Sequence, residues 1–70
     1  MTDFEKRKSA LENPNIKAED IEYFEAYDTK RKIDCLIISY WESHTHIEEI
    51  FDVNGKYLAT EEENDWDYIK

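Results

Sequence analysis

The dipeptide Asn54-Gly55 constrains the fold of this chain most, because it marks a point where the backbone must reverse. Both residue types tolerate the positive φ angles that a two-residue type I′ hairpin turn requires. Alternating apolar residues before and after it predict two strands, over residues 45–53 and 56–60. A two-residue turn also fixes which residues face each other across the hairpin. We expect three facing pairs: Val53 with Lys56, Phe51 with Leu58, and Ile50 with Ala59.

A longer apolar segment, Ile33 to Trp41, predicts a central strand of the same sheet. Apolar side chains occupy both alternating sets of positions, which is typical of a strand covered on both faces. One set is Ile33, Cys35, Ile37 and Trp41, and the other is Leu36, Ile38 and Tyr40. The preceding segment, 21–27, fits a helix or a strand by its spacing, and its aromatic content favours a strand. The polar residues 28–32 between the two segments predict a hairpin loop.

The N-terminal segment predicts a short helix over residues 3–12. Thr2 followed by Glu5 has the spacing of a capping box, in which each residue satisfies a backbone N–H group of the other. Pro14 stops the helix, because a proline disfavours helical geometry in the residue before it. A helix of this length is marginal on its own, so we expect it to dock on the sheet.

The predicted fold class follows from this order of elements. Phe4 and Leu11 lie about two helical turns apart and therefore share the face that docks. The 70 residues allow a single small domain, 1–70, with a thin core. We expect an α+β fold, with a short N-terminal helix packed on a three- to four-stranded antiparallel β-meander. An acidic C-terminal arm or short helix, 61–70, follows the last strand.

The charge of the chain is strongly negative and unevenly distributed. There are 18 acidic and 9 basic residues, which give a net charge of −9. Residues 1–32 carry seven bases and eight acids (net −1), whereas residues 33–70 carry two bases and ten acids (net −8). This balance disfavours direct binding to nucleic acid or to an anionic membrane, and it favours a basic protein partner. An acidic surface that only keeps the protein in solution is the alternative.

The compartment is predicted from the N-terminus and from cysteine usage. Met1 to Glu5 includes charges where a signal peptide needs an apolar run. The longest apolar stretch, Cys35 to Ile38, is far too short to span a membrane. The single cysteine excludes an internal disulfide and is consistent with a reducing compartment. We therefore expect a cytoplasmic protein.

Candidate catalytic and metal-binding residues are few. His44 and His46 share a side of a strand with two glutamates, but no second ligand motif accompanies them, so exposed turn histidines are expected. Cys35 lies among apolar neighbours, which is typical of a buried thiol rather than a nucleophile. The neighbours Glu48 and Glu49 point to opposite faces of a strand and cannot converge. The single glycine is used by the turn, so we expect neither catalysis nor a cofactor or metal.

The second half of the chain combines carboxylates with aromatic side chains, as protein–protein contacts often do. In the segment 61–70, acidic residues are interleaved with Trp66 and Tyr68, and aromatic residues commonly anchor interfaces. Alternatively, Trp66 and Ile69 fold back on the sheet while the acids stay solvated. The expected partner-binding residues are Glu48, Asp52, Tyr57, Glu61, Glu62, Glu63, Asp65, Trp66, Asp67 and Tyr68.

These features predict a non-enzymatic inhibitor that occludes a basic, nucleic-acid-handling surface on a larger protein. Its acidic face would mimic the charge of phosphates. Phage-encoded anti-defence inhibitors, including anti-CRISPR proteins and DNA mimics, share this profile in type, though not in sequence. An immunity protein or antitoxin that neutralises one cognate toxin would use the same electrostatics with a tighter interface. A third interpretation is an accessory module that forms a homodimer through the edge strand 56–60.

Overall fold

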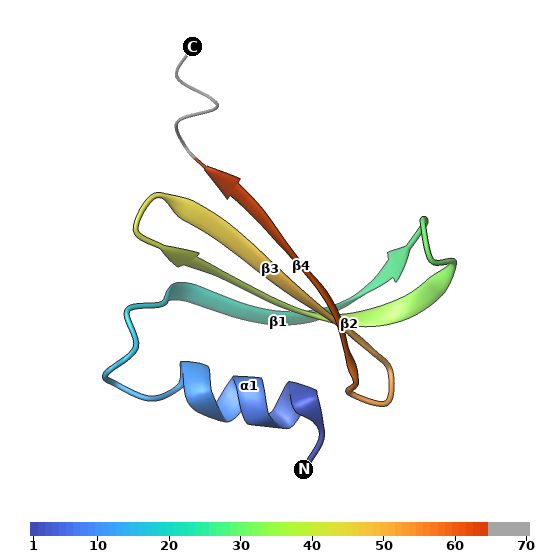
Figure 1. Ribbon diagram of the computed structural model, residues 1–70, viewed down its shortest axis with the longest axis horizontal. Coiled ribbons are helices and arrows are strands. Elements are labelled where there is room, and N and C mark those ends of the chain that lie inside the picture. The colour runs from blue at the N-terminus through green and yellow to red at the C-terminus, as the bar shows by residue number, and fades with distance from the viewer. Residues whose placement is uncertain (65–70) are drawn as a thin grey trace.

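A computed structural model describes residues 1–64, which form one helix and four strands. The elements are α1 (Asp3–Leu11), β1 (Glu19–Asp28), β2 (Ile33–Glu42), β3 (Thr45–Asp52) and β4 (Tyr57–Asn64). The strands form one antiparallel sheet in the order β1-β2-β3-β4, so each strand pairs with its neighbour in the sequence (Figure 1). The predicted α+β class with a β-meander is confirmed, and the ambiguous segment 21–27 is a strand.

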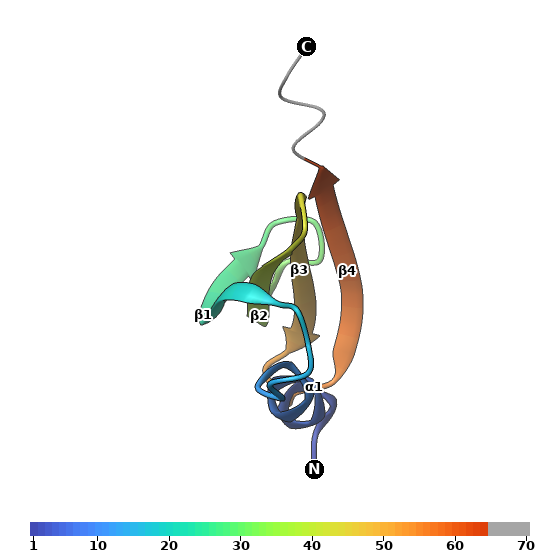
Figure 2. The ribbon, with the colours of Figure 1, turned by 90° about the vertical axis from the view of Figure 1, so that its left-hand side faces the viewer.

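The hydrophobic core lies between α1 and one face of the sheet (Figure 2). Its buried residues are Leu11, Ile38, Tyr40, Ile47 and Phe51. Phe4 packs against this cluster, and its ring meets that of Phe51 edge to face, with 5.4 Å between the centroids. The prediction that Phe4 and Leu11 share the docking face is therefore confirmed. Burying a side chain such as Leu11 contributes about 2 kcal/mol to folding, so this small cluster dominates stability.

The N-terminus of α1 is fixed both internally and by the β3–β4 hairpin. The predicted capping box forms, since Glu5 N donates to Thr2 Oγ1 at 3.1 Å and Thr2 N donates to Glu5 Oε1 at 3.1 Å. Phe4 N donates to the carbonyl of Gly55 at 2.9 Å, and Tyr57 N donates to the carboxylate of Asp3 at 3.0 Å. These bonds seat the first helical turn on the last hairpin of the chain.

The turn between β3 and β4 differs from the predicted type I′ turn. Gly55 has a φ of +88°, but Asn54 does not have positive φ. Gly55 N donates to Asp52 O and Asp52 N donates to Lys56 O, both at 2.9 Å, which defines a three-residue loop ending in a left-handed glycine. The Asp52 carboxylate stabilises this loop by accepting the N–H groups of Asn54 and Lys56, each at 2.9 Å. Val53 lies in the loop and does not face Lys56.

The register beyond the turn is partly as predicted. Ile50 faces Ala59, which confirms one predicted pair. Phe51 faces Tyr57 rather than Leu58, because the register shifts between Ile50 and Phe51. The shift is a consequence of the longer loop, which moves the first residues of β4 relative to β3.

Strand β4 is longer than the strand predicted over 56–60. It continues through three consecutive glutamates, 61–63, to Asn64, because the first half of β3 supplies ladder partners for them. The segment 61–70, expected to be an arm or a short helix, therefore begins as part of the sheet. Its remaining residues, 65–70, lie outside the described part of the chain.

Candidate functional site

The sheet has a second face, turned away from α1, which we call the open face. Residues directly opposite each other on antiparallel strands share a face, so the register arranges these side chains in rows across the sheet. One row is apolar and consists of Phe24, Ile37, Ile50 and Ala59. The next row is polar and consists of Glu22, Ser39, Glu48 and Glu61. The third consists of Glu19, Trp41, His46 and Glu63.

The apolar row is partly sheltered by the loop after β1. Residues of this loop and of all four strands line a hollow of about 240 Å³ on the open face. Inside it Cys35 is buried, which confirms the expected buried thiol, and burial raises the pKa of that thiol. Ile50 is 6% exposed, whereas Phe24, at the β1 end of the same row, is 41% exposed. The outer end of the row therefore leaves apolar surface in contact with water.

The polar row contains two carboxylates in an unfavourable arrangement. Glu48 of β3 and Glu61 of β4 are directly opposite each other and lie on the same face. Opposed like charges destabilise a sheet by a few tenths of a kcal/mol up to about 1 kcal/mol. Neither glutamate forms an ion pair within 4.0 Å with another residue of the described range 1–64. The open face thus carries negative charge that the described residues do not neutralise by direct pairing.

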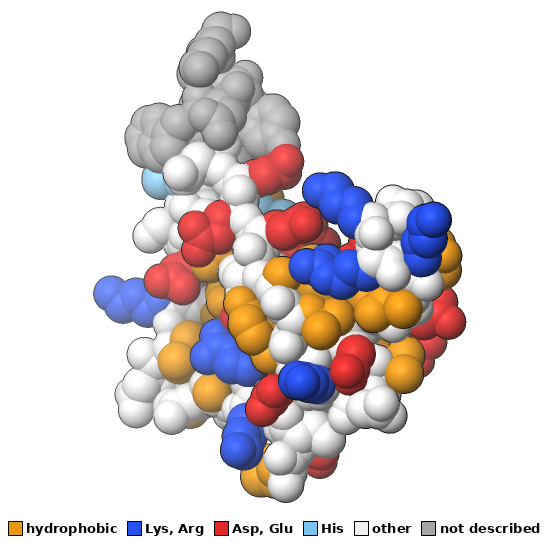
Figure 3. All heavy atoms as spheres, turned by 45° about the vertical axis from the view of Figure 1, so that its right-hand side comes forward, with side chains coloured by type: hydrophobic (Ala, Val, Ile, Leu, Met, Phe, Trp, Pro, Cys, Tyr) orange, Lys and Arg blue, Asp and Glu red, His pale blue; other side chains and the backbone are white. Residues whose placement is uncertain are grey.

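Two bases of the hairpin loop after β1, Lys30 and Arg31, lie near this row, and Arg31 interacts electrostatically with Glu61 without forming an ion pair with it. Lys30 lines a second hollow, of about 440 Å³, together with His46, Glu48 and the three glutamates 61–63. Acidic and basic side chains lie close together beside an apolar band in the space-filling view (Figure 3). One lysine set against four glutamates leaves this hollow with an excess of negative charge.

The third row is organised around His46. Its Nε2 atom lies 2.7 Å from Ser39 Oγ, and its ring is tilted against Trp41 with 5.0 Å between the centroids. Ser39 is buried, so this contact gives a buried hydroxyl group a hydrogen-bond partner. His44 lies in the turn between β2 and β3, one residue before the start of β3. The expectation of exposed turn histidines is therefore confirmed for His44 and wrong for His46, which is half-buried in β3.

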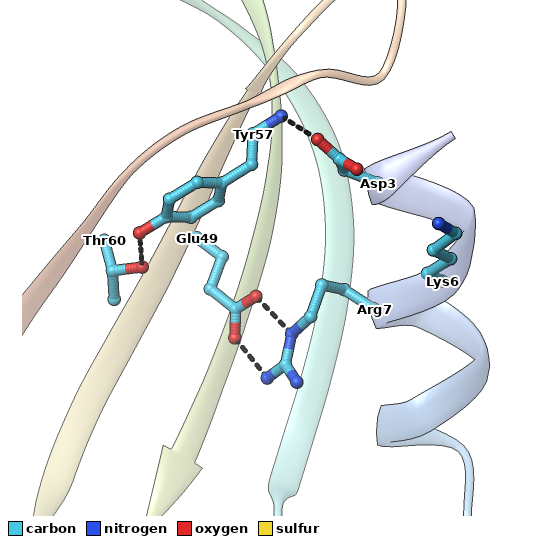
Figure 4. A pocket seen from close by; sticks show the side chains of 6 residues that line it. All are labelled: Asp3, Lys6, Arg7, Glu49, Tyr57 and Thr60. Atoms are coloured by element: carbon cyan, nitrogen blue, oxygen red, sulfur yellow. Dashed lines mark hydrogen bonds and ion pairs between the residues drawn. The ribbon is translucent and has the colours of Figure 1, made fainter. Parts of the chain in front are cut away.

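We call the face of the sheet that packs against α1 the covered face. A second polar cluster, which the sequence analysis missed, lies between α1 and this face (Figure 4). Arg7 donates from Nε to Glu49 Oε1 at 2.6 Å and from Nη2 to Glu49 Oε2 at 2.7 Å, which is a bidentate ion pair. Tyr40 OH donates to Glu49 Oε2 at 2.5 Å. The alternation of β3 could have predicted that Glu49 is buried, because it lies on the same side of the strand as the core residues Ile47 and Phe51.

The pKa directions in this cluster show that its charges are satisfied. Burial opposes ionisation of Glu49, but the hydrogen bonds from Arg7 and Tyr40 outweigh it, so the pKa of Glu49 lies below its ordinary value. Burial, together with the adjacent Glu49 carboxylate, raises the pKa of Tyr40 to about 12. The cluster borders an open hollow of about 540 Å³. Because its polar groups already bond one another, we assign it the role of holding α1 on the sheet.

The structure brings together some of the predicted partner-binding residues and separates others. Glu48, Glu61 and Glu63 share the open face. Glu62 points to the opposite face, across from Ile47.

Two further predicted residues have local partners on the hairpin. Tyr57 packs edge to face on Phe51 with 5.8 Å between ring centroids, and its hydroxyl lies 2.6 Å from Thr60 Oγ1. Asp52 is used by the turn. The other four predicted residues are outside the described range 1–64: Asp65, Trp66, Asp67 and Tyr68.

Comparison with known proteins assigns no family to this chain. No protein-family model matches it, and neither a curated protein nor a solved structure gives a significant match. Within residues 1–64, no helix has the length and apolar character needed to cross a membrane. In the same range, no group of three or more His, Cys, Asp or Glu side chains could hold a metal ion. The geometry of the open face is therefore the basis for a functional proposal.

Proposed function

We propose that the protein is a non-enzymatic inhibitor that binds a basic, nucleic-acid-handling surface of a larger protein through its open face. The observation that carries this proposal is the opposed pair Glu48 and Glu61, which has no ion-pair partner within residues 1–64. A lysine or arginine of a partner would turn this repulsion into attraction. The apolar surface of Phe24, which is exposed in the free protein, would be buried by the same partner.

The spacing of the carboxylates supports mimicry of a phosphate backbone. Glu61 and Glu63 are two residues apart on one strand, so their Cα atoms are separated by about 6.8 Å. Successive phosphates of one DNA strand advance by about 3.4 Å along the helix axis and are also displaced around it, so the distance between neighbouring phosphates exceeds this rise and approaches the spacing of the two glutamates. A surface whose basic side chains are spaced for nucleic acid would therefore meet carboxylates at matching intervals.

The proposed class is a phage-type anti-defence inhibitor, such as an anti-CRISPR protein or a DNA mimic. Such a protein acts by occupying a surface, so the proposal requires no catalytic residue, cofactor or direct contact with nucleic acid. Steering between opposite charges would accelerate association at low salt, and salt would slow it. We place the protein in the cytoplasm, where a free thiol such as that of Cys35 stays reduced.

The test is capture of the partner followed by a functional assay on that partner. Tagged protein is used on lysate of the native host at low and high salt, and the captured protein is then purified. Its nucleic-acid binding is measured by gel shift with and without the inhibitor. The variant Glu48→Gln/Glu61→Gln removes two charges from the open face. Glu25→Gln/Asp34→Asn removes two charges from the other face, since Glu25 is opposite Leu36 and Asp34 is two residues before it, and this variant serves as the matched control.

We expect the wild-type protein and the control variant to displace nucleic acid from the partner, and the open-face variant to fail. Circular dichroism of each variant checks that the fold is retained. Capture of a partner whose nucleic-acid binding is unchanged would contradict the proposal. So would equal displacement by the two double variants, because the open face would then have no special role.

A further inference from the structure

The outer edge of β4 is a regular backbone edge that the described residues leave unpaired, and it carries consecutive glutamates. β4 is the last strand of the sheet, and from Ala59 to Asn64 its pairing with β3 runs without interruption. An edge strand presents unpaired N–H and C=O groups, which are the groups that strand addition uses. The other edge, β1, is irregular only at its start, where the register shifts between Glu19 and Glu22, and it is regular from Glu22 to Asp28. Apart from Asp28, which forms an ion pair with Arg31, β1 places one carboxylate on the open face over that regular stretch, whereas β4 places two there, so β4 is the edge that favours a basic strand.

We propose that the β4 edge binds an extended basic segment of the partner by strand addition. This inference rests on the proposed function and specifies how the partner is held. A strand added beside β4 continues the rows of the open face, so its alternate side chains fall next to Ala59, Glu61 and Glu63. Basic side chains at two of these places and an apolar one at the third would match the rows.

Charge decides which occupant this edge accepts. In a second copy of the chain, the residues brought to the edge would be the same glutamates, 61–63, or the acidic strand β1. Pairing this edge with a second copy would place like charges directly opposite each other on the two strands, which disfavours self-association. A basic strand meets the same glutamates with opposite charge. The edge is therefore selective for a basic segment over a homodimer.

The geometry also predicts the sequence pattern of the segment. An antiparallel strand meets Glu63 first, then Glu61 and then Ala59, so its pattern is basic-x-basic-x-apolar. The positions marked x lie on the other face, beside Glu62 and Thr60. A suitable probe is the acetylated, amidated peptide Thr-Lys-Thr-Lys-Thr-Val. The reversed sequence probes parallel pairing.

The experiment separates backbone pairing from simple charge attraction. Two N-methylated forms of the peptide, with methyl groups at alternate residues, carry the same charge. Only one form keeps the N–H groups that face β4. The binding of each form to the full-length protein is measured by titration. Hydrogen exchange of the protein amides is followed in parallel.

We expect one methylated form to bind like the parent and the other to bind at least about tenfold more weakly, since it loses several backbone hydrogen bonds. Alternate amides between Ala59 and Asn64 should exchange more slowly in the complex, while those of β1 should not change. Glu61→Gln/Glu63→Gln should weaken binding, and Glu25→Gln/Asp34→Asn, which removes two charges away from the β4 edge, should not. Equal binding of both methylated forms, or no binding of the parent peptide at low salt, would overturn strand addition.

These outcomes are separable from those for the proposed function. If the open-face variant loses the captured partner but the β4 amides are not protected, the acidic face is the contact and strand addition alone is wrong. If the amides are protected but the captured protein does not handle nucleic acid, the binding mode stands and the inhibitor role falls.

Discussion

Glu48 and Glu49 are adjacent in the sequence and lie on opposite faces of the same strand, in opposite electrostatic situations. Glu49 is buried on the covered face, where Arg7 and Tyr40 donate three short hydrogen bonds to its carboxylate. Glu48 lies on the open face, opposite a second carboxylate. The covered face satisfies a charge that it must bury, whereas the open face leaves like charges together. An arrangement that costs stability is typical of a surface shaped by binding.

Among the substitutions that test this comparison, we expect the largest change in stability from Arg7→Met, which breaks the ion pair with Glu49 on the covered face. We expect a loss of about 2 kcal/mol in the free energy of unfolding, because Glu49 is left buried without its counter-charge. This is less than the ~3–5 kcal/mol of a fully buried pair, since Arg7 is partly exposed and water screens it. Urea denaturation measures the loss. Arg31→Met, which breaks the local pair with Asp28, is the matched control and should change stability less, because Asp28 still accepts the backbone N–H groups of residues 30 and 31.

The seating of α1 on the covered face is tested by Gly55→Ala. The residue has positive φ, and an added Cβ would lie 2.6 Å from Thr2 Cβ, so the substitution strains the turn and displaces the helix cap. We expect a loss of about 1–2 kcal/mol, measured by thermal unfolding. Asn54→Ala in the same loop lacks this conflict and serves as the control. A neutral effect of Gly55→Ala would show that the contact between cap and hairpin contributes nothing.

The pH dependence of stability sharpens the comparison further. The pKa of Glu49 is lower in the folded protein than its ordinary value, so its charge stabilises the fold above the unfolded pKa of about 4.3. This contribution is lost as the pH falls through the folded pKa. Glu49→Gln should therefore be less stable than wild type at pH 7, by about 1 kcal/mol, and the difference should shrink in acid. A difference that stays constant between pH 7 and pH 3 would contradict this account.

The smallest expected change in stability is a gain, whereas the substitutions above are expected to cause losses. Glu61→Lys replaces the repulsion with Glu48 by attraction, so we expect a gain of about 0.5 kcal/mol in stability and weaker partner binding. Glu62→Lys changes the net charge equally but lies across from Ile47, so its gain should be smaller. The midpoints of urea unfolding compare the two variants. Equal gains would mean that overall charge, not the opposed pair, sets the effect.

Local patterns in the sequence predicted most of the fold. The capping box of Thr2 and Glu5, and the alternation in 33–41, depend on neighbours within a few residues, and both are confirmed. The turn type was wrong because the Asp52 carboxylate favours a longer loop. The length of β4 was wrong because glutamates have low strand propensity, yet pairing with β3 holds 61–63 in the ladder.

The candidate site was less accessible from sequence. The predicted register, in which Ile50 faces Ala59, also places Glu48 opposite Glu61, but the last strand was expected to end at residue 60, so this pair was not identified. The bond between Arg7 and Glu49 joins residues 42 positions apart, which no local pattern specifies. The partner-binding role of the acidic residues stays a prediction, as does that of the aromatic pair Trp66 and Tyr68.

The contact between Asp3 and Tyr57 has a consequence for synthesis in the cell. The two residues are 54 positions apart, and the hairpin that receives α1 is made after the other strands of the sheet. At roughly 5–20 residues per second, the ribosome adds the intervening segment in about 3–10 s. During that time the β1–β2 hairpin can form from neighbouring residues, but α1 has no complete surface on which to dock. The earliest-made element of this protein is thus among the last to reach its place.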